Sequence, residues 1–332
     1  MKLISIGIAQ INFTVGDIDG NVKKILLAIN NARDLHSCEI VVFPELSVTG
    51  YPPEDLLLRS DFLDKVDDSL TFLTEQIEGI YAVIGHPIRA ENVLFNAASV
   101  INNKTIQAQY FKRELPNFGV FDEKRYFTPG NKPCVVQMGN FRVGLTICED
   151  VWHDNPVREC VESGSELILN LNASPYDISK AKEREELIVS RQAKLHSIPI
   201  IYTNLVGGQD ELVFDGRSFV CDSKGQIIHR SPCFREDITS ININEQFSVI
   251  TESSCQSLEG SEVVYQALCT GLNDYVKKNN FTGAVLGLSG GIDSALTLAV
   301  AVDSLGKENV TALLMPSRFN REISLCDAKE QS

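Results

Sequence analysis

The chain has 332 residues, 43% of them hydrophobic, which is enough for two domains with sizeable cores. Its net charge of −14 argues against nucleic-acid binding, because nucleic-acid-binding proteins normally carry a basic stripe. No apolar run is long enough for a membrane span or a signal peptide, and the nine cysteines form no CxxC pair. We therefore expect a cytoplasmic protein without a disulfide framework, a zinc site, a membrane partner or a nucleic-acid partner.

The first half of the chain alternates apolar strands with amphipathic helices. Helices are predicted to begin at the capping residues Asp19 and Ser60, because apolar side chains then recur every three or four positions. Asn102-Asn103 and Gly139-Asn140 predict the turns of two hairpins. Strands are predicted at residues 4–11, 40–43 and 81–85.

The pattern continues with helices set between strands. Helices are predicted at residues 156–162 and 179–196, and strands at residues 167–171, 198–203 and on both sides of 222–225. This alternation fits a two-sheet sandwich with helices outside.

A polar stretch divides the chain into two predicted domains. Glu, Ser and Gln dominate after Ile243, so we place a linker at residues 246–260, after a first domain at residues 1–245. The second domain, residues 261–332, is predicted to contain a helix to Lys278, a strand, a Gly-rich turn, a second helix and a strand at residues 310–314.

Three reactive side chains directly follow apolar, strand-like runs. Cys148 follows Thr146-Ile147, Glu45 follows Phe43-Pro44, and Lys112 follows Tyr110-Phe111. If these strands are neighbours, Glu45 can take the proton of the Cys148 thiol. Lys112 and the backbone N–H after Cys148 would then stabilise an oxyanion, and one such donor is worth roughly 3–4 kcal/mol.

The residue types alone leave a structural interpretation open. A cysteine that ends a strand is more often part of an inert core, a Pro-Glu pair there is usually a turn, and a lysine there is usually solvated. The segment from Lys180 to Lys194 mixes basic with acidic residues, which is typical of a solvated helix face.

The motifs around these residues resemble the nitrilase, or carbon-nitrogen hydrolase, superfamily. Residues 43–46, 111–116 and 147–152 carry the Glu, Lys and Cys in that order. Residues 117–123 and 172–176 are similar to one branch, the glutaminase domains of glutamine-dependent NAD synthetases. The resemblance covers roughly residues 1–245 and implies an α/β fold, the nitrilase-like αββα sandwich.

The resemblance also implies a role for each matching residue. Glu45 would be the general base, Lys112 the transition-state stabiliser and Cys148 the nucleophile. Glu123 would be a second carboxylate that holds Lys112 and the amino group of the substrate.

Three further residues would contact glutamine in such a site: Phe118, Ser174 and Lys180. Lys180 suits the α-carboxylate of the amino acid because it carries the opposite charge. Many relatives have tyrosine where this chain has Phe118, so the resemblance implies only backbone contacts at that position.

A Gly-rich turn lies between an apolar run and an apolar-periodic helix. A strand, a Gly-rich turn and a helix together aim several backbone N–H groups at a phosphate. The turn contains no lysine, so it is not a Walker loop, and it resembles the pyrophosphate loop of the ATP pyrophosphatase family. The resemblance implies ATP binding by the whole turn, with Asp293 orienting Mg²⁺: Gly287, Leu288, Ser289, Gly290, Gly291, Ile292, Asp293 and Ser294.

The residues after this turn resemble the next strand and loop of an NAD synthetase domain, through residues 314–318, 323–324 and 327–328. We therefore expect residues 261–332 to form the first part of a Rossmann-like parallel-sheet domain of the adenine nucleotide α-hydrolase type. The residues that bind deamido-NAD are expected to lie beyond Ser332, which makes the chain a truncated one.

The resemblance implies an ATP-dependent carbon–nitrogen ligase of NAD biosynthesis that forms a homo-oligomer. Glutamine hydrolysis supplies ammonia without a cofactor, and ATP adenylates deamido-NAD. Ammonia then displaces AMP to give NAD, AMP and pyrophosphate. This chain is expected to retain only the glutaminase half, and two alternatives stay open: a stand-alone amidase with a vestigial tail, and a non-catalytic assembly domain.

Overall fold

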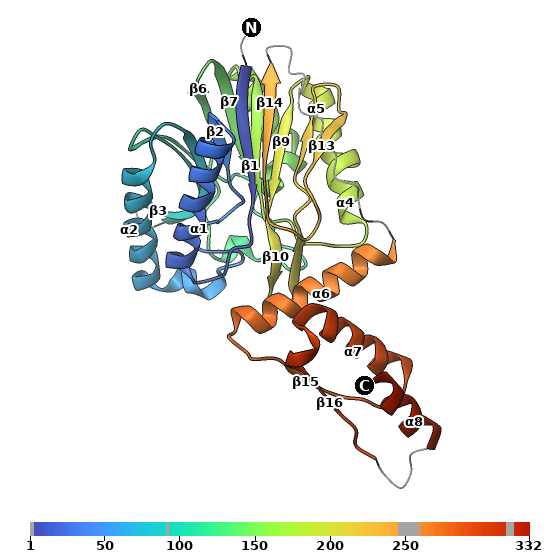
Figure 1. The fold of residues 1–332 in the computed structure, drawn as a ribbon. Helices are drawn as coiled ribbons and strands as arrows, with labels where there is room; N and C mark the ends of the chain where they lie inside the picture. Colours follow the sequence, from blue (N-terminus) through green and yellow to red (C-terminus); the bar gives the residue numbers. More distant parts are fainter. Residues whose placement is uncertain (1–2, 91–92, 245–257, 259, 317–321) are drawn as a thin grey trace. The chain divides into compact units, whose positions relative to one another are not determined.

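The computed structural model describes residues 3–90, 93–244, 258, 260–316 and 322–332. They divide into two compact units, which are the described parts of residues 1–207 and 214–257 and the described parts of residues 208–213 and 258–332 (Figure 1). Most of the predicted linker, and the Ser317-Arg318 pair, lie outside the described residues. Among the described helices, none is long and apolar enough to cross a membrane.

The first unit contains two six-stranded sheets that share one pattern of pairing. In the first sheet, the order is β14-β1-β2-β3-β4-β5, and β1, β2 and β3 run parallel between antiparallel neighbours. Its strands are β1 (Leu3–Gln10), β2 (Ile40–Val42), β3 (Tyr81–Ala90), β4 (Val93–Asn102), β5 (Thr105–Phe111) and β14 (Asp237–Asn244).

The second sheet has the order β13-β12-β9-β8-β7-β6, and here β7, β8 and β9 are the parallel strands. A separate two-stranded hairpin consists of β10 (Val206–Gln209) and β11 (Leu212–Asp215). The strands of the second sheet are β6 (Val135–Met138), β7 (Phe141–Ile147), β8 (Leu167–Asn172), β9 (Ile200–Asn204), β12 (Phe219–Cys221) and β13 (Ile227–Arg230).

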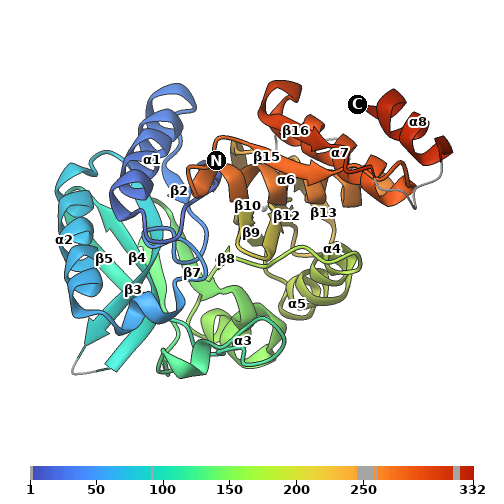
Figure 2. The ribbon, with the colours of Figure 1, turned by 90° about the horizontal axis from the view of Figure 1, so that it is seen from below.

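Helices cover the outer faces of both sheets, which gives the predicted αββα sandwich (Figure 2). α1 (Ile18–Asn30) and α2 (Ser60–Gln76) lie outside the first sheet, and α3 (Asp154–Glu162) and α5 (Ser190–His196) lie outside the second. Shorter helical segments are η1 (Asn31–Leu35), η2 (Glu54–Leu58), η3 (Glu123–Arg125), η4 (Cys148–Trp152), α4 (Lys180–Lys182) and η5 (Glu183–Val189).

The main core lies between the two sheets. Leu167, Leu169 and Leu171 of β8 belong to this core together with the buried side chains of β1, while Ile168 packs with α3 and α5. Successive side chains of a strand point to opposite faces, so β8 is buried on both faces, as expected for a parallel strand between two layers, although Asn170 and Asn172 share the face of Ile168.

Two predicted helix starts were wrong. α1 is capped by Asp17, whose carboxylate accepts the N–H of Gly20 at 3.1 Å, and Asp19 lies in the first turn. Both aspartates precede the same apolar pattern, so the pattern did not choose between them. Ser60 is the first residue of α2 rather than its cap.

The helix predicted at residues 179–196 is present without a break at residues 180–196, but its type changes along the chain. Its middle, η5, is a π-helix, in which an extra residue per turn shifts the inward face. As a result, Arg184 and Glu185, which are neighbours in sequence, are both buried. Arg184 pairs with Asp215, and Glu185 pairs with Arg217 at 2.9 Å.

One glycine of β3 allows the loop after β2 to lie against the sheet. A Cβ at Gly85 would come within 2.6 Å of the Leu46 nitrogen and the Pro44 oxygen. These backbone atoms flank Glu45, so any side chain at position 85 would displace the loop that carries Glu45.

The second unit pairs two parallel strands with helices. The chain order is α6 (Ser261–Lys278), β15 (Ala284–Gly287), α7 (Ile292–Leu305), η6 (Lys307–Asn309), β16 (Val310–Leu313) and α8 (Glu322–Gln331). β15 and β16 are parallel, which agrees with the predicted Rossmann-like arrangement.

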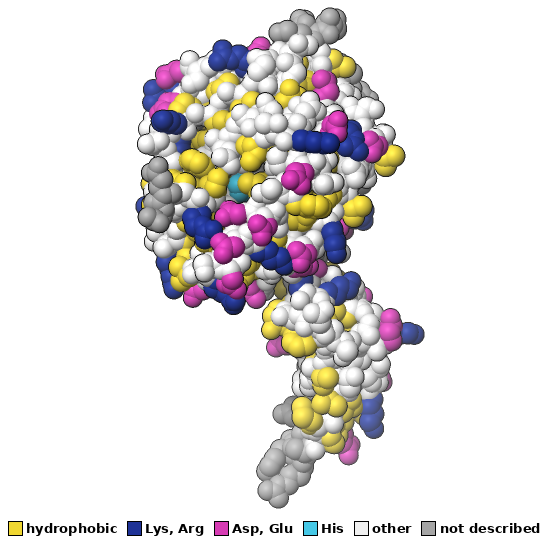
Figure 3. All heavy atoms as spheres, turned by 90° about the vertical axis from the view of Figure 1, so that its left-hand side faces the viewer, with side chains coloured by type: hydrophobic (Ala, Val, Ile, Leu, Met, Phe, Trp, Pro, Cys, Tyr) yellow, Lys and Arg dark blue, Asp and Glu magenta, His cyan; other side chains and the backbone are white. Residues whose placement is uncertain are grey.

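Charges of both signs are mixed on the surface of the first unit. Figure 3 shows Lys and Arg side chains interspersed with Asp and Glu side chains on one face. Arg89, for example, pairs with Asp64 at 2.6 Å and with Asp67 at 3.0 Å. On this face the charges do not form a basic stripe. The solvated helix face predicted from Lys180 to Lys194 is wrong for Arg184 and Glu185, which are buried.

Candidate active site

Strand ends bring Glu45 and Lys112 together in the first unit. Lys112 Nζ lies 2.6 Å from Glu45 Oε1 and 2.8 Å from Glu123 Oε1, and all three side chains are buried. Asn96 Nδ2 donates to Glu45 Oε1 at 2.7 Å, and the Ala173 N–H donates to Glu45 Oε2 at 3.1 Å. Both oxygens of Glu45 are therefore held in place.

Cys148 is the first residue after β7 and the first residue of the 3₁₀ turn η4. Its φ of +44° lies in the left-handed region, which costs a non-glycine residue about 1–3 kcal/mol. Only 5% of the residue is exposed. The strained turn places a buried thiol at the end of a parallel strand, where catalytic groups often lie.

Burial and neighbouring charges set the protonation of the thiol. Burial raises the pKa of the Cys148 thiol well above its usual value, Glu45 raises it further, and Lys112 opposes both. The thiol is therefore protonated at neutral pH, so an attack by sulfur requires a base close by.

The lysine keeps its charge because two carboxylates surround it. Burial alone would lower the pKa of Lys112, but Glu123 and Glu45 raise it well above its usual value. For Glu123, burial raises the pKa to about 7, and Lys112 opposes this shift. Lys112 can thus act as a fixed positive charge, while Glu123 exchanges a proton near neutral pH.

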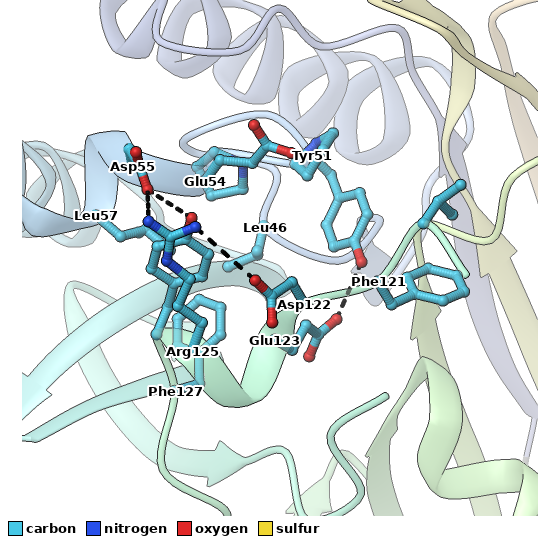
Figure 4. A pocket seen from close by; sticks show the side chains of 14 residues that line it. Leu46, Tyr51, Glu54, Asp55, Leu57, Phe121, Asp122, Glu123, Arg125 and Phe127 are labelled. Atoms are coloured by element: carbon cyan, nitrogen blue, oxygen red, sulfur yellow. Dashed lines mark hydrogen bonds and ion pairs between the residues drawn. The ribbon is translucent and has the colours of Figure 1, made fainter. Parts of the chain in front are cut away.

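A pocket of about 160 Å³ lies beside Glu123 (Figure 4). Tyr51 and Glu123 point toward one another in it, and the Tyr51 hydroxyl donates to Glu123 Oε1 at 3.0 Å. Glu123 Oε2 is buried and has no hydrogen-bond partner in the structure. At the rim, Arg125 lies 3.0 Å from Asp55. A buried acceptor without a partner suits a ligand that brings an N–H donor.

Ser174 lies one residue after the contact between Ala173 and Glu45. Its N–H donates to Asn204 Oδ1 at 2.9 Å, and its carbonyl accepts from Asn204 Nδ2 and Arg184 Nη1, each at 3.2 Å. The serine backbone is therefore fixed next to the Glu45 carboxylate.

Lys180 and Phe118 lie in less constrained surroundings. The Lys180 ammonium lies 4.2 Å from the ring centroid of Trp152, which ends the turn that begins with Cys148, and 3.3 Å from Glu183. Phe118 is 56% exposed, and its ring meets the edge of Phe121 at 5.7 Å. The ring contact of Phe118 is thus with Phe121 at the surface, whereas Glu45, Lys112 and Cys148 are buried.

Sequence reasoning missed three residues that hold these groups: Asn96, Tyr51 and Asn204. A signal existed for two of them, because Asn96 and Asn204 are polar residues within or at the end of apolar strands. A buried polar side chain needs partners, so such a residue indicates a network. Tyr51 follows a loop and gave no such signal.

The Gly-rich turn of the second unit is held by hydroxyl groups. Ser294 Oγ accepts the Ser289 N–H at 3.2 Å and donates to the Gly291 carbonyl at 2.9 Å. Gly290 has φ +81°, and a Cβ there would lie 2.1 Å from the Ser324 oxygen. Gly287, Ser289, Gly291, Ile292 and Asp293 are exposed, and Leu288 is buried. The turn thus offers its backbone to a solvent-borne ligand.

Asp293, which the sequence assigned to Mg²⁺, lies in the first turn of α7. Among the described residues, no group of three or more His, Cys, Asp or Glu side chains could hold a metal ion. A single carboxylate still fits Mg²⁺ that is bound mainly by nucleotide phosphates and water.

Comparisons with known families show what both parts of the chain are similar to. Residues 5–248 match the profile described as Carbon-nitrogen hydrolase. The chain belongs to the carbon-nitrogen hydrolase family. Residues 264–331 match the profile described as NAD synthase, so the carbon-nitrogen hydrolase unit is followed by a segment similar to a second family.

Relatives share both parts. The chain is 41% identical over 335 residues to the glutamine-dependent NAD(+) synthetase of Xylella fastidiosa, with 99% of this chain and 61% of the relative covered. The structure of glutamine-dependent NAD+ synthetase from Acinetobacter baumannii with ADP matches at 38% identity and a TM-score of 0.94. That match covers 99% of this chain and 62% of the other, so the chain spans less than two thirds of these relatives.

A similar fold occurs without the second part. The amidase of Nesterenkonia sp. AN1, in a double mutant with acrylamide, matches with a TM-score of 0.66 and 23% identity over 73% of this chain and 91% of the amidase chain. At this level of identity the likeness extends to the carbon-nitrogen hydrolase fold alone.

Proposed function

We propose that the carbon-nitrogen hydrolase unit hydrolyses the side-chain amide of glutamine, with Cys148 as nucleophile, Glu45 as general base and Lys112 as oxyanion stabiliser. The observation that carries this proposal is the buried Lys112 ammonium held between Glu45 and Glu123 at the ends of strands β2 and β5. Burying a charge is costly, and a chain keeps such a group where it does chemistry.

The first half-reaction transfers the acyl group to sulfur. Cys148 Sγ attacks the amide carbon while Glu45 takes the thiol proton. The resulting oxyanion accepts hydrogen bonds from Lys112 Nζ and from the backbone N–H of Glu149. The tetrahedral intermediate collapses, the carbon–nitrogen bond breaks, and the proton on Glu45 passes to the leaving nitrogen as ammonia departs.

The second half-reaction returns the enzyme to its starting state. Water attacks the glutamyl thioester, Glu45 accepts a proton from the water, and the carbon–sulfur bond breaks. The sulfur regains its proton, and glutamate leaves. A base that is anchored through both oxygens and shielded from water can serve both halves without moving.

Four other residues are proposed to bind glutamine. Glu123 would accept hydrogen bonds from the substrate through its free Oε2, and Ser174 lies beside the base. Lys180 would pair with the α-carboxylate in place of Glu183, and Phe118 would contribute through its backbone. These assignments rest on the matching positions, and for Glu123 and Ser174 also on contacts of Glu123 with Lys112 and of the neighbouring Ala173 with Glu45.

We further propose that the protein takes part in glutamine-dependent NAD synthesis, with ATP and Mg²⁺ at the turn of residues 287–294 and deamido-NAD as the acceptor. The relatives' names and the exposed, hydroxyl-lined turn support this proposal. Ammonia is mostly protonated at neutral pH and is then a poor nucleophile, so supplying it directly from glutamine has a chemical advantage. The predicted homo-oligomer, cytoplasmic location and retention of only the glutaminase half stay predictions.

The test measures ammonia and glutamate formed from glutamine by the purified 332-residue chain. Wild-type chain should release both in equal amounts, and the C148A variant should release neither. Cys326→Ala, which removes an exposed cysteine of α8, is the matched control and should behave as wild type. Equal turnover in C148A and wild type would refute the assignment.

Substrate choice separates the alternatives. Turnover of simple aliphatic amides in preference to glutamine would favour a general amidase, because such amides lack the α-amino and α-carboxylate groups that Glu123 and Lys180 are proposed to bind. An absence of any turnover, together with an unreactive Cys148, would favour an assembly domain.

A further inference from the structure

One buried carboxylate outside the proposed catalytic residues joins the two strand ends that carry them. Asp150 has no exposed surface and accepts four hydrogen bonds. Its Oδ1 accepts the N–H groups of Arg113 at 3.0 Å and Glu114 at 2.9 Å. Its Oδ2 accepts the Ile147 N–H and the Tyr110 hydroxyl, each at 2.8 Å. All lone-pair positions of an ionised carboxylate are then in use.

The four donors flank the reactive groups on both sides. Tyr110 and Arg113 lie two residues before and one residue after Lys112, at the exit of β5. Ile147 immediately precedes Cys148, at the exit of β7. A single side chain therefore fixes the distance between the backbone of Lys112 and the backbone of Cys148, although β5 and β7 belong to different sheets.

The carboxylate also caps the turn of Cys148. Asp150 is the third residue of η4, and it bonds the N–H of the residue before that turn. This is the side-chain half of a capping box, which satisfies a donor that the helical turn leaves free. The bond lies next to the left-handed φ of Cys148, a conformation that persists only where its surroundings hold it.

We propose that Asp150 is a positioning residue, which holds the Lys112 ammonium and the Cys148 sulfur at the separation that attack on an amide requires. The proposal rests on the amide hydrolysis proposed above, because it assigns the geometry of that site. A displacement of a reacting group by about 1 Å can lower the rate about 100-fold, so we expect the hydrogen bonds of Asp150 to have a large effect on turnover.

Asp150 can accept all four hydrogen bonds only when its carboxylate is ionised. Burial raises the pKa of Asp150 to about 6, while the Ile147 and Glu114 N–H groups, the Tyr110 hydroxyl and Lys112 oppose the shift. At neutral pH the group therefore accepts all four bonds. An asparagine there would turn an amide NH₂ toward an N–H donor, and the Ile147 N–H or the pair at Arg113 and Glu114 would lose its acceptor.

The first measurement compares kcat and KM for glutamine hydrolysis in Asp150→Asn and Tyr110→Phe. We expect D150N to lower kcat by about 30- to 100-fold and to change KM by less than about threefold, since the lost contacts align the reacting groups. Y110F removes one of the four bonds and should lower kcat by about three- to tenfold.

The matched control is Asp222→Asn. Asp222 accepts the N–H groups of Lys224 at 2.9 Å and Gln226 at 2.8 Å in the turn between β12 and β13. Like Asp150, it is a carboxylate that holds a turn, but its turn is exposed and carries no reactive group. D222N should keep the wild-type kcat, and a loss equal to that of D150N would overturn the proposal.

The second measurement follows the alkylation of Cys148 by iodoacetamide against pH, with the modified cysteine identified by mass spectrometry. The titratable groups that face the thiol are unchanged in every variant: Glu45, Tyr51, Lys112, Glu123, Glu149 and Tyr202. If Asp150 positions Lys112, the reaction of D150N moves to higher pH, because the lysine no longer offsets the thiolate charge. If Asp150 acts only as a nearby negative charge, its neutralisation moves the reaction to lower pH.

The two measurements separate the failure of this proposal from the failure of the proposed function. Alkylation needs no glutamine turnover, so the position of Lys112 is tested even in a chain that hydrolyses no amide. A folded D150N protein with wild-type kcat and a wild-type alkylation profile would overturn the proposal. Should D150N fail to fold, Y110F gives the same test. We expect its alkylation profile to move to higher pH by a smaller amount, and an unchanged profile would contradict the proposal.

Discussion

The two candidate sites of this chain are built in opposite ways. Around Cys148 the reactive groups are side chains, and Glu45, Lys112 and Cys148 are each at most 5% exposed. Around the Gly-rich turn the groups offered to a ligand are backbone N–H groups and serine hydroxyls, most of them exposed.

This difference follows from the two kinds of chemistry. Covalent attack on an amide needs shifted protonation, which burial and paired charges provide. Binding of a highly charged phosphate needs N–H donors that remain open to solvent until the ligand arrives. The first site is fixed by contacts between strands far apart in the sequence, whereas the hydroxyl contacts that hold the second join residues within five positions of one another. Substitutions should therefore affect the two sites independently, and four experiments test this.

The largest effect is expected from Glu45→Gln. Glutamine has nearly the same shape but cannot take the thiol proton, so glutamine hydrolysis should fall by about 100- to 10,000-fold. ATP binding, measured by calorimetry, should not change. The control is Glu39→Gln, an exposed glutamate just before β2, which should keep full activity. A hydrolysis rate in E45Q within tenfold of wild type would contradict a role as base.

The next effect concerns the second site. Gly290→Ala requires a side chain at φ +81° and 2.1 Å from the Ser324 oxygen, so the turn must distort. We expect ATP affinity to fall at least tenfold, equivalent to about 1.4 kcal/mol. In the control Gly291→Ala, the nearest atom to the new Cβ is Ser289 Oγ at 3.4 Å, and the loss should be smaller. Reduced glutamine hydrolysis in G290A would break the independence of the two sites.

A smaller effect is expected on stability against pH, through Glu123→Gln. The pKa of Glu123 is raised to about 7 by burial, so the folded chain binds a proton that the unfolded chain releases from about pH 4.5 upward. This group therefore favours folding at low pH, and its contribution is lost as the pH rises through about 7.

Urea unfolding of wild type and E123Q at pH 5 and pH 8 measures that contribution. The stability of wild type relative to E123Q should be lower at pH 8 than at pH 5. Groups present in both proteins, such as Asp150, contribute equally to the two unfolding free energies and cancel in this comparison. A relative stability that rises with pH would mean that Lys112 outweighs burial at Glu123.

The smallest effect is expected from Phe118→Tyr. Phe118 is 56% exposed and its proposed contribution is made by backbone atoms, so the added hydroxyl should change KM for glutamine by less than about threefold. Steady-state kinetics check this. A tenfold lower KM would instead assign the side chain at position 118 a direct contact with the substrate.

The sequence predicted the sandwich and the convergence of strand ends, because apolar periodicity and order along the chain are local signals. It could not predict how Glu45 and Glu123 are held. Asn96 lies 51 residues from Glu45, and Tyr51 lies 72 residues from Glu123, so these contacts depend on the folded arrangement of strands. The resemblance to a family suggested roles, but it gave no information on Asp150.

The wrong predictions concern details within single helices. Asp17 and Asp19 both fit the start of α1, and only the hydrogen bond to Gly20 separates them. The π-helical type of η5 was not predicted. Its first four residues are charged, which is typical of an exposed helix, whereas Arg184 and Glu185 are buried and pair with Asp215 and Arg217, about 30 residues further along the chain.

Gly85 shows that a position can matter for the reaction without contributing any atom to it. The loop that presents Glu45 lies in the space that a methyl group would need, with backbone atoms 2.6 Å from that point. In a library of all single substitutions selected for activity, position 85 should be as depleted as position 45. Such a library would identify position 85 as necessary for activity, although glycine has no side chain that could react.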